Sequence, residues 1–233
     1  MQVGCRIDGV TVNNISYADD MVLLSPSIGG LRKLLRVCEA YAVEHGLKYN
    51  VTKSEFMIFK GKNKGPVHVP PLLLNGITIR RVPRFKYLGH ILTEELMDDE
   101  DIERERRALS VRGNMLAHRF TRCTVSVKLT LFKAYCQSFY TCGLWARFTK
   151  RAYDSLRVQY NNVFRVLLRL PRFCSASGMF ADAHMDDFYA IIRKKTASIV
   201  QRIRGSDNGI LRMIADRMDS AILSRFTLLH VKK

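Results

Sequence analysis

The stretch NISYADDMVLL, residues 14–24, places two adjacent aspartates between two short apolar runs. The runs at 15–18 and 21–24 predict a β-hairpin with Asp19 and Asp20 at its tip, and both have the composition of buried strands. Successive side chains of a regular strand point to opposite faces. Two neighbouring carboxylates can therefore face one spot only where the backbone turns, and aspartate tolerates turns.

The aspartate pair has two interpretations. Like charges a few ångströms apart disfavour joint ionisation unless a cation compensates them. Mg²⁺ is the natural cation, because it prefers oxygen ligands and is often held by one or two carboxylates together with substrate phosphates. Two such ions can activate an attacking oxygen and stabilise a leaving one during phosphoryl transfer. The alternative is a polar hairpin tip that binds no ion.

The sequence on both sides of the pair predicts further short strands. An Asp-Gly pair inside residues 3–12 and an Asn-Gly pair inside residues 72–79 each lie between apolar residues, which is typical of two-residue β-hairpins. Residues 53–59 and 84–92 each predict one more strand.

One helix follows the aspartate hairpin directly. Ser27 is suited to cap its start, and apolar residues then recur at helical spacing from Leu31 to Ala42. Gly46 stands where a helix of this length would end. A sheet with a helix behind it favours the interpretation in which the aspartates top a sheet.

From residue 94 onward the pattern becomes helical. Apolar residues recur at 102, 109 and 116, and the segments 125–145, 153–170 and 186–204 also have helical spacing. The sequence therefore predicts an α+β fold. Hairpins and a helix occupy residues 1–93, a basic helical part occupies 94–170, and a helical C-terminal extension occupies 171–233.

The chain is strongly basic, with a formal net charge of +17. From Arg104 to Arg172 there are 15 Lys and Arg residues against only Glu105 and Asp154. A solvated surface usually mixes both signs, so this excess predicts a polyanionic partner such as nucleic acid. A basic domain without such a partner and an anionic membrane surface are the alternatives.

Other signals mainly exclude classes of protein. No apolar run is long enough to span a membrane, and the first ten residues lack the pattern of a secretory signal. The six cysteines form no C-x-x-C pair, which favours reduced, mostly core cysteines of an intracellular protein over a disulfide framework or a zinc site.

Three blocks of this sequence resemble reverse transcriptases in the form found in non-LTR (LINE-type) retrotransposons. YADD at residues 17–20 resembles the signature of the family. HGLKYNVTKSEFMIF at 45–59 resembles its next block, and FKYLGHIL at 85–92 resembles the block that forms the primer grip. The helical remainder resembles the thumb and the connector that follows it, so the resemblance spans nearly the whole chain.

The resemblance implies roles for four residues near the hairpin. Asp19 and Asp20 would be catalytic and would bind two Mg²⁺ ions, with Asp19 the more direct ligand. Tyr17 would line the floor of the site near the primer end. Lys53 would be catalytic, near the incoming triphosphate, as a proton donor to pyrophosphate; the alternative is a solvated lysine at the start of a strand.

The resemblance also implies nucleic-acid contacts further along the chain. Tyr87, Leu88 and Gly89 would lie in the primer grip, where glycine allows close approach of the backbone; core packing is the alternative for the first two. Arginines of the thumb would face the backbone of a template–primer duplex, with ordinary surface positions as the alternative. These arginines are Arg104, Arg106, Arg107, Arg112, Arg119 and Arg122.

The family also requires a third carboxylate, a fingers region and a template-binding block, all upstream of YADD, and none of them is present here. We therefore expect a C-terminal palm and thumb piece of an RNA-directed DNA polymerase that is inactive alone. Its expected partners are an RNA template, a DNA primer and deoxynucleoside triphosphates, with no membrane and no small-molecule cofactor. By resemblance it would act in the nucleus and cytoplasm as a ribonucleoprotein. The alternative is a non-catalytic nucleic-acid-binding remnant.

Overall fold

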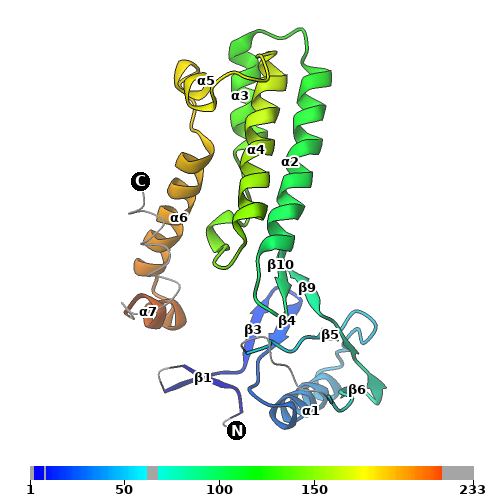
Figure 1. Ribbon diagram of the computed structural model, residues 1–233. Helices are drawn as coiled ribbons and strands as arrows, with labels where there is room; N and C mark the ends of the chain where they lie inside the picture. The colour runs from blue at the N-terminus through cyan, green and yellow to red at the C-terminus, as the bar shows by residue number, and fades with distance from the viewer. Residues whose placement is uncertain (1–2, 8, 62–67, 217–233) are drawn as a thin grey trace. The chain divides into compact units, whose positions relative to one another are not determined.

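The computed structural model describes residues 3–7, 9–61 and 68–216. The protein is α+β, as predicted, with short strand pairs first and helices after them. The chain forms two compact units, Met1–Phe85 and Lys86–Lys233, and most of their elements are labelled in Figure 1. The division into three parts at residues 93 and 170 stays a prediction.

Three predicted hairpins are present in the first unit. Their strands pair antiparallel as β1 (Cys5–Ile7) with β2 (Val10–Val12), β3 (Asn14–Tyr17) with β4 (Asp20–Leu23), and β6 (Leu73–Leu74) with β7 (Ile77–Thr78). Asn75 and Gly76 have φ angles of +52° and +76°, which is the conformation that an Asn-Gly hairpin turn requires. Gly9 has a φ of +83°, while Asp8 lies outside the described residues.

Helix α1 (Ile28–Glu44) begins and ends where the sequence predicts. The Ser27 hydroxyl accepts a hydrogen bond from the Gly30 N–H, which satisfies one of the free donors at the helix start. At the other end Gly46 has a φ of +65°, and the Leu47 N–H donates to the Ala42 carbonyl over 2.8 Å. This is the Schellman arrangement that closes many helices with glycine.

The strands around the two aspartates are not buried, contrary to the prediction. All four residues of β3 are exposed, and Ile15 retains 46% of its accessible surface. In the described part of this unit β3 and β4 form a sheet of two strands only, so no third strand pairs with either edge. Only Leu23, at the end of β4 away from the turn, packs against a core. That core consists of Leu35, Leu72, Leu74 and Ile79.

The remaining strands are shorter than predicted. Of the predicted strand 53–59, only β5 (Glu55–Phe56) is regular, and it pairs in parallel with β8 (Arg80–Arg81). The prediction of one strand over 84–92 is wrong, because β9 (Arg84–Tyr87) and β10 (His90–Thr93) form a hairpin. The residues between them, Leu88 and Gly89, have φ angles of +46° and +86°, which reverse the chain.

The second unit consists mainly of helices. In chain order they are α2 (Asp99–Arg119), α3 (Val125–Cys136), the 3₁₀ turn η1 (Cys142–Leu144), α4 (Lys150–Leu168), α5 (Ala176–Asp182), α6 (Phe188–Arg204) and α7 (Gly209–Asp216). The predicted helix over 125–145 is too long. It ends at Cys136 because Phe139 has a φ of +21°, outside the helical range, with its side chain in the core. No helix within the described ranges is long and apolar enough to cross a membrane.

Helices α2 and α4 run in the same direction and lie against each other, and α3 runs in the opposite direction beside them (Figure 1). At their N-terminal ends the Thr149 N–H donates to Asp99 Oδ1 over 3.0 Å. Further along, Gly113 lies directly against Val163. Both pairs are separated by 50 residues in the sequence, so the two helices keep the same register over their length.

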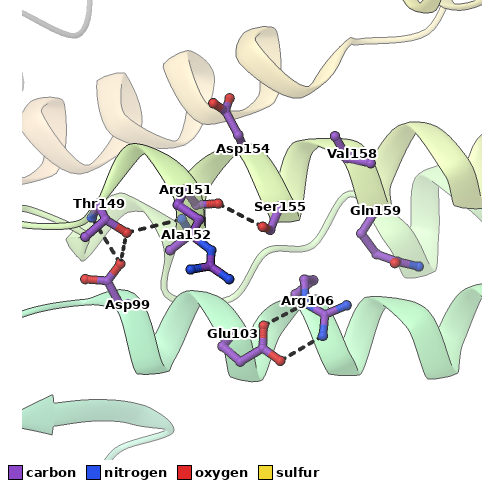
Figure 2. Close-up of a pocket in the computed structure, with 10 residues that line it drawn as sticks. All are labelled: Asp99, Glu103, Arg106, Thr149, Arg151, Ala152, Asp154, Ser155, Val158 and Gln159. Atoms are coloured by element: carbon purple, nitrogen blue, oxygen red, sulfur yellow. Dashed lines mark hydrogen bonds and ion pairs between the residues drawn. The ribbon is translucent and has the colours of Figure 1, made fainter.

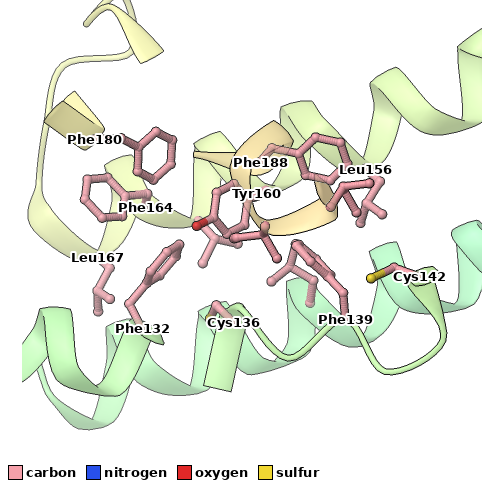
Figure 3. Close-up of a cluster of buried hydrophobic side chains, with 14 of the residues drawn as sticks. Phe132, Cys136, Phe139, Cys142, Leu156, Tyr160, Phe164, Leu167, Phe180 and Phe188 are labelled. Carbon is pink, nitrogen blue, oxygen red and sulfur yellow. The ribbon is translucent and has the colours of Figure 1, made fainter. Parts of the chain in front are cut away.

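The core of the second unit is rich in aromatic residues (Figure 3). Tyr160 lies at its centre, stacked on Phe180 with a centroid distance of 5.2 Å. Phe132 meets Phe164 edge-on at 4.9 Å. The Tyr160 hydroxyl donates to the Asp186 carbonyl over 2.9 Å, so this buried polar group is satisfied.

Candidate active site and nucleic-acid interface

The turn of the YADD hairpin consists of Ala18 and Asp19. Tyr17 and Asp20 form the last pair of the ladder, so Asp20 is the first residue of β4 and Asp19 lies within the turn itself. Ala18 has a φ of +53°, a conformation that costs a non-glycine residue about 1–2 kcal/mol. Strain of this kind persists where the surrounding structure imposes it, and often marks functional sites.

The two carboxylates are available to a cation. Both are exposed, and neither has an ion-pair partner within the described ranges. Two free carboxylates fit the way proteins hold Mg²⁺, which needs few protein ligands beside substrate phosphates. In the part of the chain that the structure describes, however, no three His, Cys, Asp or Glu residues group closely enough to hold a metal ion. Among the described residues the candidate ligands are therefore only the pair Asp19 and Asp20.

Lys53 lies on a turn that Asn50 organises. The Asn50 side-chain oxygen accepts hydrogen bonds from the Lys53 N–H over 3.1 Å and from the Thr52 hydroxyl over 2.7 Å. The Ser54 hydroxyl donates to the Asn50 carbonyl over 2.9 Å. The asparagine and serine of this block thus shape the backbone, and the Lys53 side chain is exposed to solvent.

Tyr87, Leu88 and Gly89 form the turn between β9 and β10. Leu88 is exposed and has a positive φ, which is unusual for leucine. A Cβ atom at residue 89 would lie 2.9 Å from Cε1 of Tyr140, so glycine is required there by both its φ and its neighbour. The buried Tyr87 hydroxyl has no hydrogen-bond partner among the described residues.

Two of the predicted nucleic-acid-binding arginines on α2 bind buried carboxylates of the same helix. Arg104 Nε lies 2.8 Å from Asp101 Oδ1, and Arg112 Nη2 lies 2.5 Å from Glu105 Oε1. Asp101 and Glu105 are almost completely buried, so these arginines neutralise charges inside the unit. Their contact with nucleic acid stays a prediction. In the structure both arginines compensate buried carboxylates of α2.

The other four arginines differ in exposure and pairing. Arg106 donates two hydrogen bonds to Glu103, and Arg107 donates a third from the exposed side of the helix. These arginines hold the pKa of Glu103 at about 2, mainly through the hydrogen bonds from Arg106. Arg119 and Arg122 are exposed, without an ion-pair partner in the described ranges.

A buried polar network that no sequence pattern predicted is centred on Asp101. Its carboxylate accepts hydrogen bonds from the Ile91 N–H over 3.1 Å, the Thr141 hydroxyl over 2.5 Å and the Trp145 indole over 2.7 Å. These donors come from β10 and from the connection between α3 and α4. Asp101 thus joins β10 and the α3–α4 connection to α2.

His90 completes this network. Its Nδ1 lies 3.2 Å from Asp101 Oδ2, and its Nε2 lies 3.4 Å from Asp98 Oδ1. Asp98 also accepts hydrogen bonds from the N–H groups of Ala146 and Arg147 over 2.7 and 2.8 Å. We call His90, Asp98, Asp101, Arg104, Thr141 and Trp145 the Asp101 network. Thr141, Trp145 and Ala146 lie 40 or more residues from the carboxylates that they bind, so no local pattern indicated these contacts.

The network changes the ionisation of its members. Burial lowers the pKa of His90, but the hydrogen bonds to Asp101 and Asp98 outweigh it and raise this pKa to about 9. Burial raises the pKa of Asp101, and its hydrogen bonds, foremost from His90 and Arg104, outweigh that effect and bring it far below its ordinary value. At neutral pH a buried imidazolium therefore lies between two carboxylates.

A groove of about 750 Å³ runs between α2 and α4 (Figure 2). The charged groups along it are largely bound to one another. Glu103 is paired with Arg106, and Asp99 accepts hydrogen bonds from the N–H and hydroxyl of Thr149. The third carboxylate, Asp154, lies 3.3 Å from Arg157 Nε. A groove with three carboxylates is a poor surface for a polyanion.

Comparison with known proteins gives one match, which covers the first part of the chain. Residues 3–92 match the family described as "Reverse transcriptase (RNA-dependent DNA polymerase)". The matched range contains the YADD turn, Lys53 and the turn at Tyr87–Gly89. No curated protein and no solved structure matches the chain. Residues 3–92, with their aspartate-bearing hairpin, are thus similar to the reverse transcriptase domain of RNA-dependent DNA polymerases.

Proposed function

We propose that this chain contributes the C-terminal palm and the thumb of a reverse transcriptase of a non-LTR (LINE-type) retrotransposon. The observation that carries the proposal is the match of residues 3–92 to the reverse transcriptase family, with YADD at the turn of a two-stranded hairpin. The basic helical unit that follows supports a substrate made of phosphates.

In this proposal Asp19 and Asp20 bind Mg²⁺. The ions would stabilise the developing charge during phosphoryl transfer to a primer end. Their free, exposed carboxylates support this role. The third carboxylate ligand would come from polypeptide outside the described residues, so we expect the chain to be inactive without that segment.

The other predicted site residues act on the substrates. Lys53, exposed on its turn, would approach the triphosphate of the incoming nucleotide, and the turn at Tyr87–Gly89 would approach the primer. Arg119 and Arg122 are the best placed of the six arginines to meet the template–primer backbone, because they are exposed and not occupied by carboxylates in the described ranges.

Primer extension tests the proposal. The chain alone, and the chain joined to the residues encoded upstream in the same reading frame, are incubated with an RNA template, a DNA primer, deoxynucleoside triphosphates and Mg²⁺. We expect extension only with the joined protein. Asp19→Asn or Asp20→Asn should abolish it, whereas Asp182→Asn, a change at an exposed aspartate of the helical unit, should not. Extension that survives the first two substitutions would refute the proposed metal site.

A second function is favoured by the charge of the chain. With a net charge of +17 and exposed arginines that have no ion-pair partner among the described residues, the chain would bind nucleic acid without catalysis. This function predicts salt-sensitive binding that survives Asp19→Ala, with no nucleotide incorporation even by the joined protein. Calorimetric titration with Mn²⁺ separates the two proposals. If Asp19 binds metal, Asp19→Asn should lower the affinity for Mn²⁺; if the chain only binds nucleic acid, the substitution should leave that affinity unchanged.

A further inference from the structure

The C-terminal ends of α2 and α4 lie at the same end of the helical unit. The helices are parallel with a constant offset of 50 residues, shown by Asp99 with Thr149 and by Gly113 with Val163. Because of this offset, Arg169 lies at the same height along the helix pair as Arg119. One further arginine follows each helix closely, Arg122 after α2 and Arg172 after α4. We call Arg119, Arg122, Arg169 and Arg172 the basic end.

The positive charge of the basic end is not compensated. All four arginines are exposed, and none has an ion-pair partner among the residues the structure describes. The sequence contains no Asp or Glu between Glu105 and Asp154, or between Asp154 and Asp182. Helix α3 begins at this same end, with no acidic residue in its first turn.

The opposite end of the bundle has the reverse character. There the N-terminal turns of α2 contain Asp98, Asp99, Asp101, Glu103 and Glu105. The α2 arginines at that end, Arg104, Arg106 and Arg107, are bound to carboxylates of this group. A polyanion approaching the bundle would therefore be attracted to the basic end, where the arginines do not have to leave an internal partner.

Phe173 adds an aromatic surface to the basic end. It is 92% exposed and follows Arg172 directly. The turn that carries it is well anchored: Arg165 Nη2 donates to the Cys174 carbonyl over 2.9 Å, and the Cys174 N–H donates to the Pro171 carbonyl over 3.0 Å. Cys174 also packs against the core. The phenyl ring is thus held outward by a fixed backbone.

We propose that the basic end binds single-stranded nucleic acid, with phosphates on the arginines and an unpaired base stacked on Phe173. Proteins that bind single strands combine a basic track with aromatic side chains, because every base offers a face for stacking. A membrane surface would require a larger apolar face than one phenylalanine provides. Within the proposed function, the basic end would be the surface that holds a single strand. This binding does not require that the chain polymerises.

The first experiment observes the stacking directly. The chain has one tryptophan, Trp145, and it is buried, so Phe173→Trp adds an exposed indole at the proposed site. A single-stranded 12-mer should quench the added emission in the full chain, and a blunt duplex of equal charge should quench it much less. Equal quenching by both would refute base stacking.

The second experiment measures affinity by fluorescence anisotropy of labelled nucleic acid. Phe173→Ala should weaken binding of the single strand about 10-fold, with little effect on the duplex. Phe59→Ala is the matched control, because Phe59 is also an exposed phenylalanine but lies in the first unit. Phe173→Trp should retain the affinity.

Charge reversal tests the arginines. Arg169→Glu with Arg172→Glu should reduce the slope of log affinity against log salt by about 1.4. The control pair, Lys150→Glu with Arg151→Glu, changes the net charge equally but lies at the N-terminal end of α4. An equal loss in both pairs would show that only net charge matters, and would overturn the proposed location.

Two further outcomes would also overturn the proposal. Arginines near helix C-termini can simply stabilise the helix dipole. In that case the reversal at 169 and 172 would lower the melting temperature and leave nucleic-acid affinity unchanged. Alternatively, vesicles of anionic phospholipid could bind the chain through Phe173 more tightly than the single strand does, which would assign this end to a membrane surface.

Discussion

At the scale of single residues, Asp101 shows how one carboxylate can join distant segments. It is fully buried, yet it accepts hydrogen bonds from a strand, a helix and a loop. Removing a partner from such a network is costly, because it leaves a buried charge uncompensated. His90, its cationic partner, titrates in an accessible pH range.

His90 should make the stability of the helical unit depend on pH. Its pKa is raised from 6.5 to about 9, so its contribution is complete below pH 6.5 and is lost as the pH rises through about 9. We expect the free energy of unfolding to fall by at most about 3 kcal/mol over this range. Urea denaturation at a series of pH values measures it.

Two substitutions test this assignment. His90→Gln should flatten the pH dependence between 6.5 and 9, because the raised pKa is then absent. His118→Gln, at an exposed histidine of α2, should leave the profile of the original chain unchanged. If the two variants gave the same profile, another group would have to carry the titration.

Gly89 is a second residue whose identity the structure explains. Gly89→Ala should destabilise the helical unit by about 1–2 kcal/mol, because alanine is strained at a φ of +86°. Its Cβ would also press on the ring of Tyr140. A double-mutant cycle with Tyr140→Ala separates these causes: the contact part should disappear, and the backbone part should remain. Strictly additive effects would show that the ring does not lie against the glycine.

At the scale of secondary-structure elements, Gly113 sets the distance between α2 and α4. A Cβ at this position would lie 2.6 Å from both γ-methyl groups of Val163. Gly113→Ala should therefore destabilise the unit by about 1–2 kcal/mol through overpacking, although alanine is the better helix former. Thermal unfolding followed by circular dichroism measures the loss.

Val163→Ala provides the rescue for this prediction. The double variant should recover much of the stability lost in Gly113→Ala, because the methyl groups that clash are gone. Gly178→Ala in α5 is the control, since its nearest atom would be at an ordinary 3.7 Å and the change should be close to neutral. A loss at Gly178 equal to that at Gly113 would contradict the packing argument.

Elements with local signals were predictable from the sequence. Helix α1 has its cap residue Ser27 and its terminal Gly46 within the segment itself, and the Asn-Gly turn at 75–76 needs no distant partner. The hairpin β9–β10 was missed because nothing in a leucine indicates that Leu88 will adopt a positive φ. The end of α3 was missed because burial of Phe139 in the core decides it.

In the candidate site, too, only the features with local signals were predictable from the sequence. The position of Asp19 and Asp20 at a hairpin turn follows from local sequence. The acidic residues at the start of α2 suit the positive end of the helix dipole, but local sequence does not show that Asp98 and Asp101 also bind groups 40 to 49 residues away. The exposure of β3 could not be predicted, because apolar composition does not say what will cover a strand.

At the scale of the whole molecule, the two units have cores of different size. The first unit buries Leu35, Leu72, Leu74 and Ile79, whereas the second buries an extensive aromatic cluster around Tyr160. Since burial of apolar surface provides most of the stability of a fold, the first unit should open at lower denaturant.

Hydrogen exchange measures this difference between the units. In native-state exchange with increasing urea, amides of α1 should exchange at lower urea than amides in the middle of α2 and α4. Leu34, Leu109 and Phe164 are suitable reporters, because each is buried in its helix. A single cooperative transition for all three would show that the units do not open separately.

The parallel direction of α2 and α4 has a consequence for how the helical unit folds. Helices α2 and α4 cannot pack against each other until the whole of α3 and both connections have been made, because their contacts join residues 50 positions apart. Closing loops of that length costs entropy before any contact repays it. We therefore expect α2, α3 and α4 to assemble together in one slow, cooperative step, and not to accumulate as a stable helical pair during synthesis.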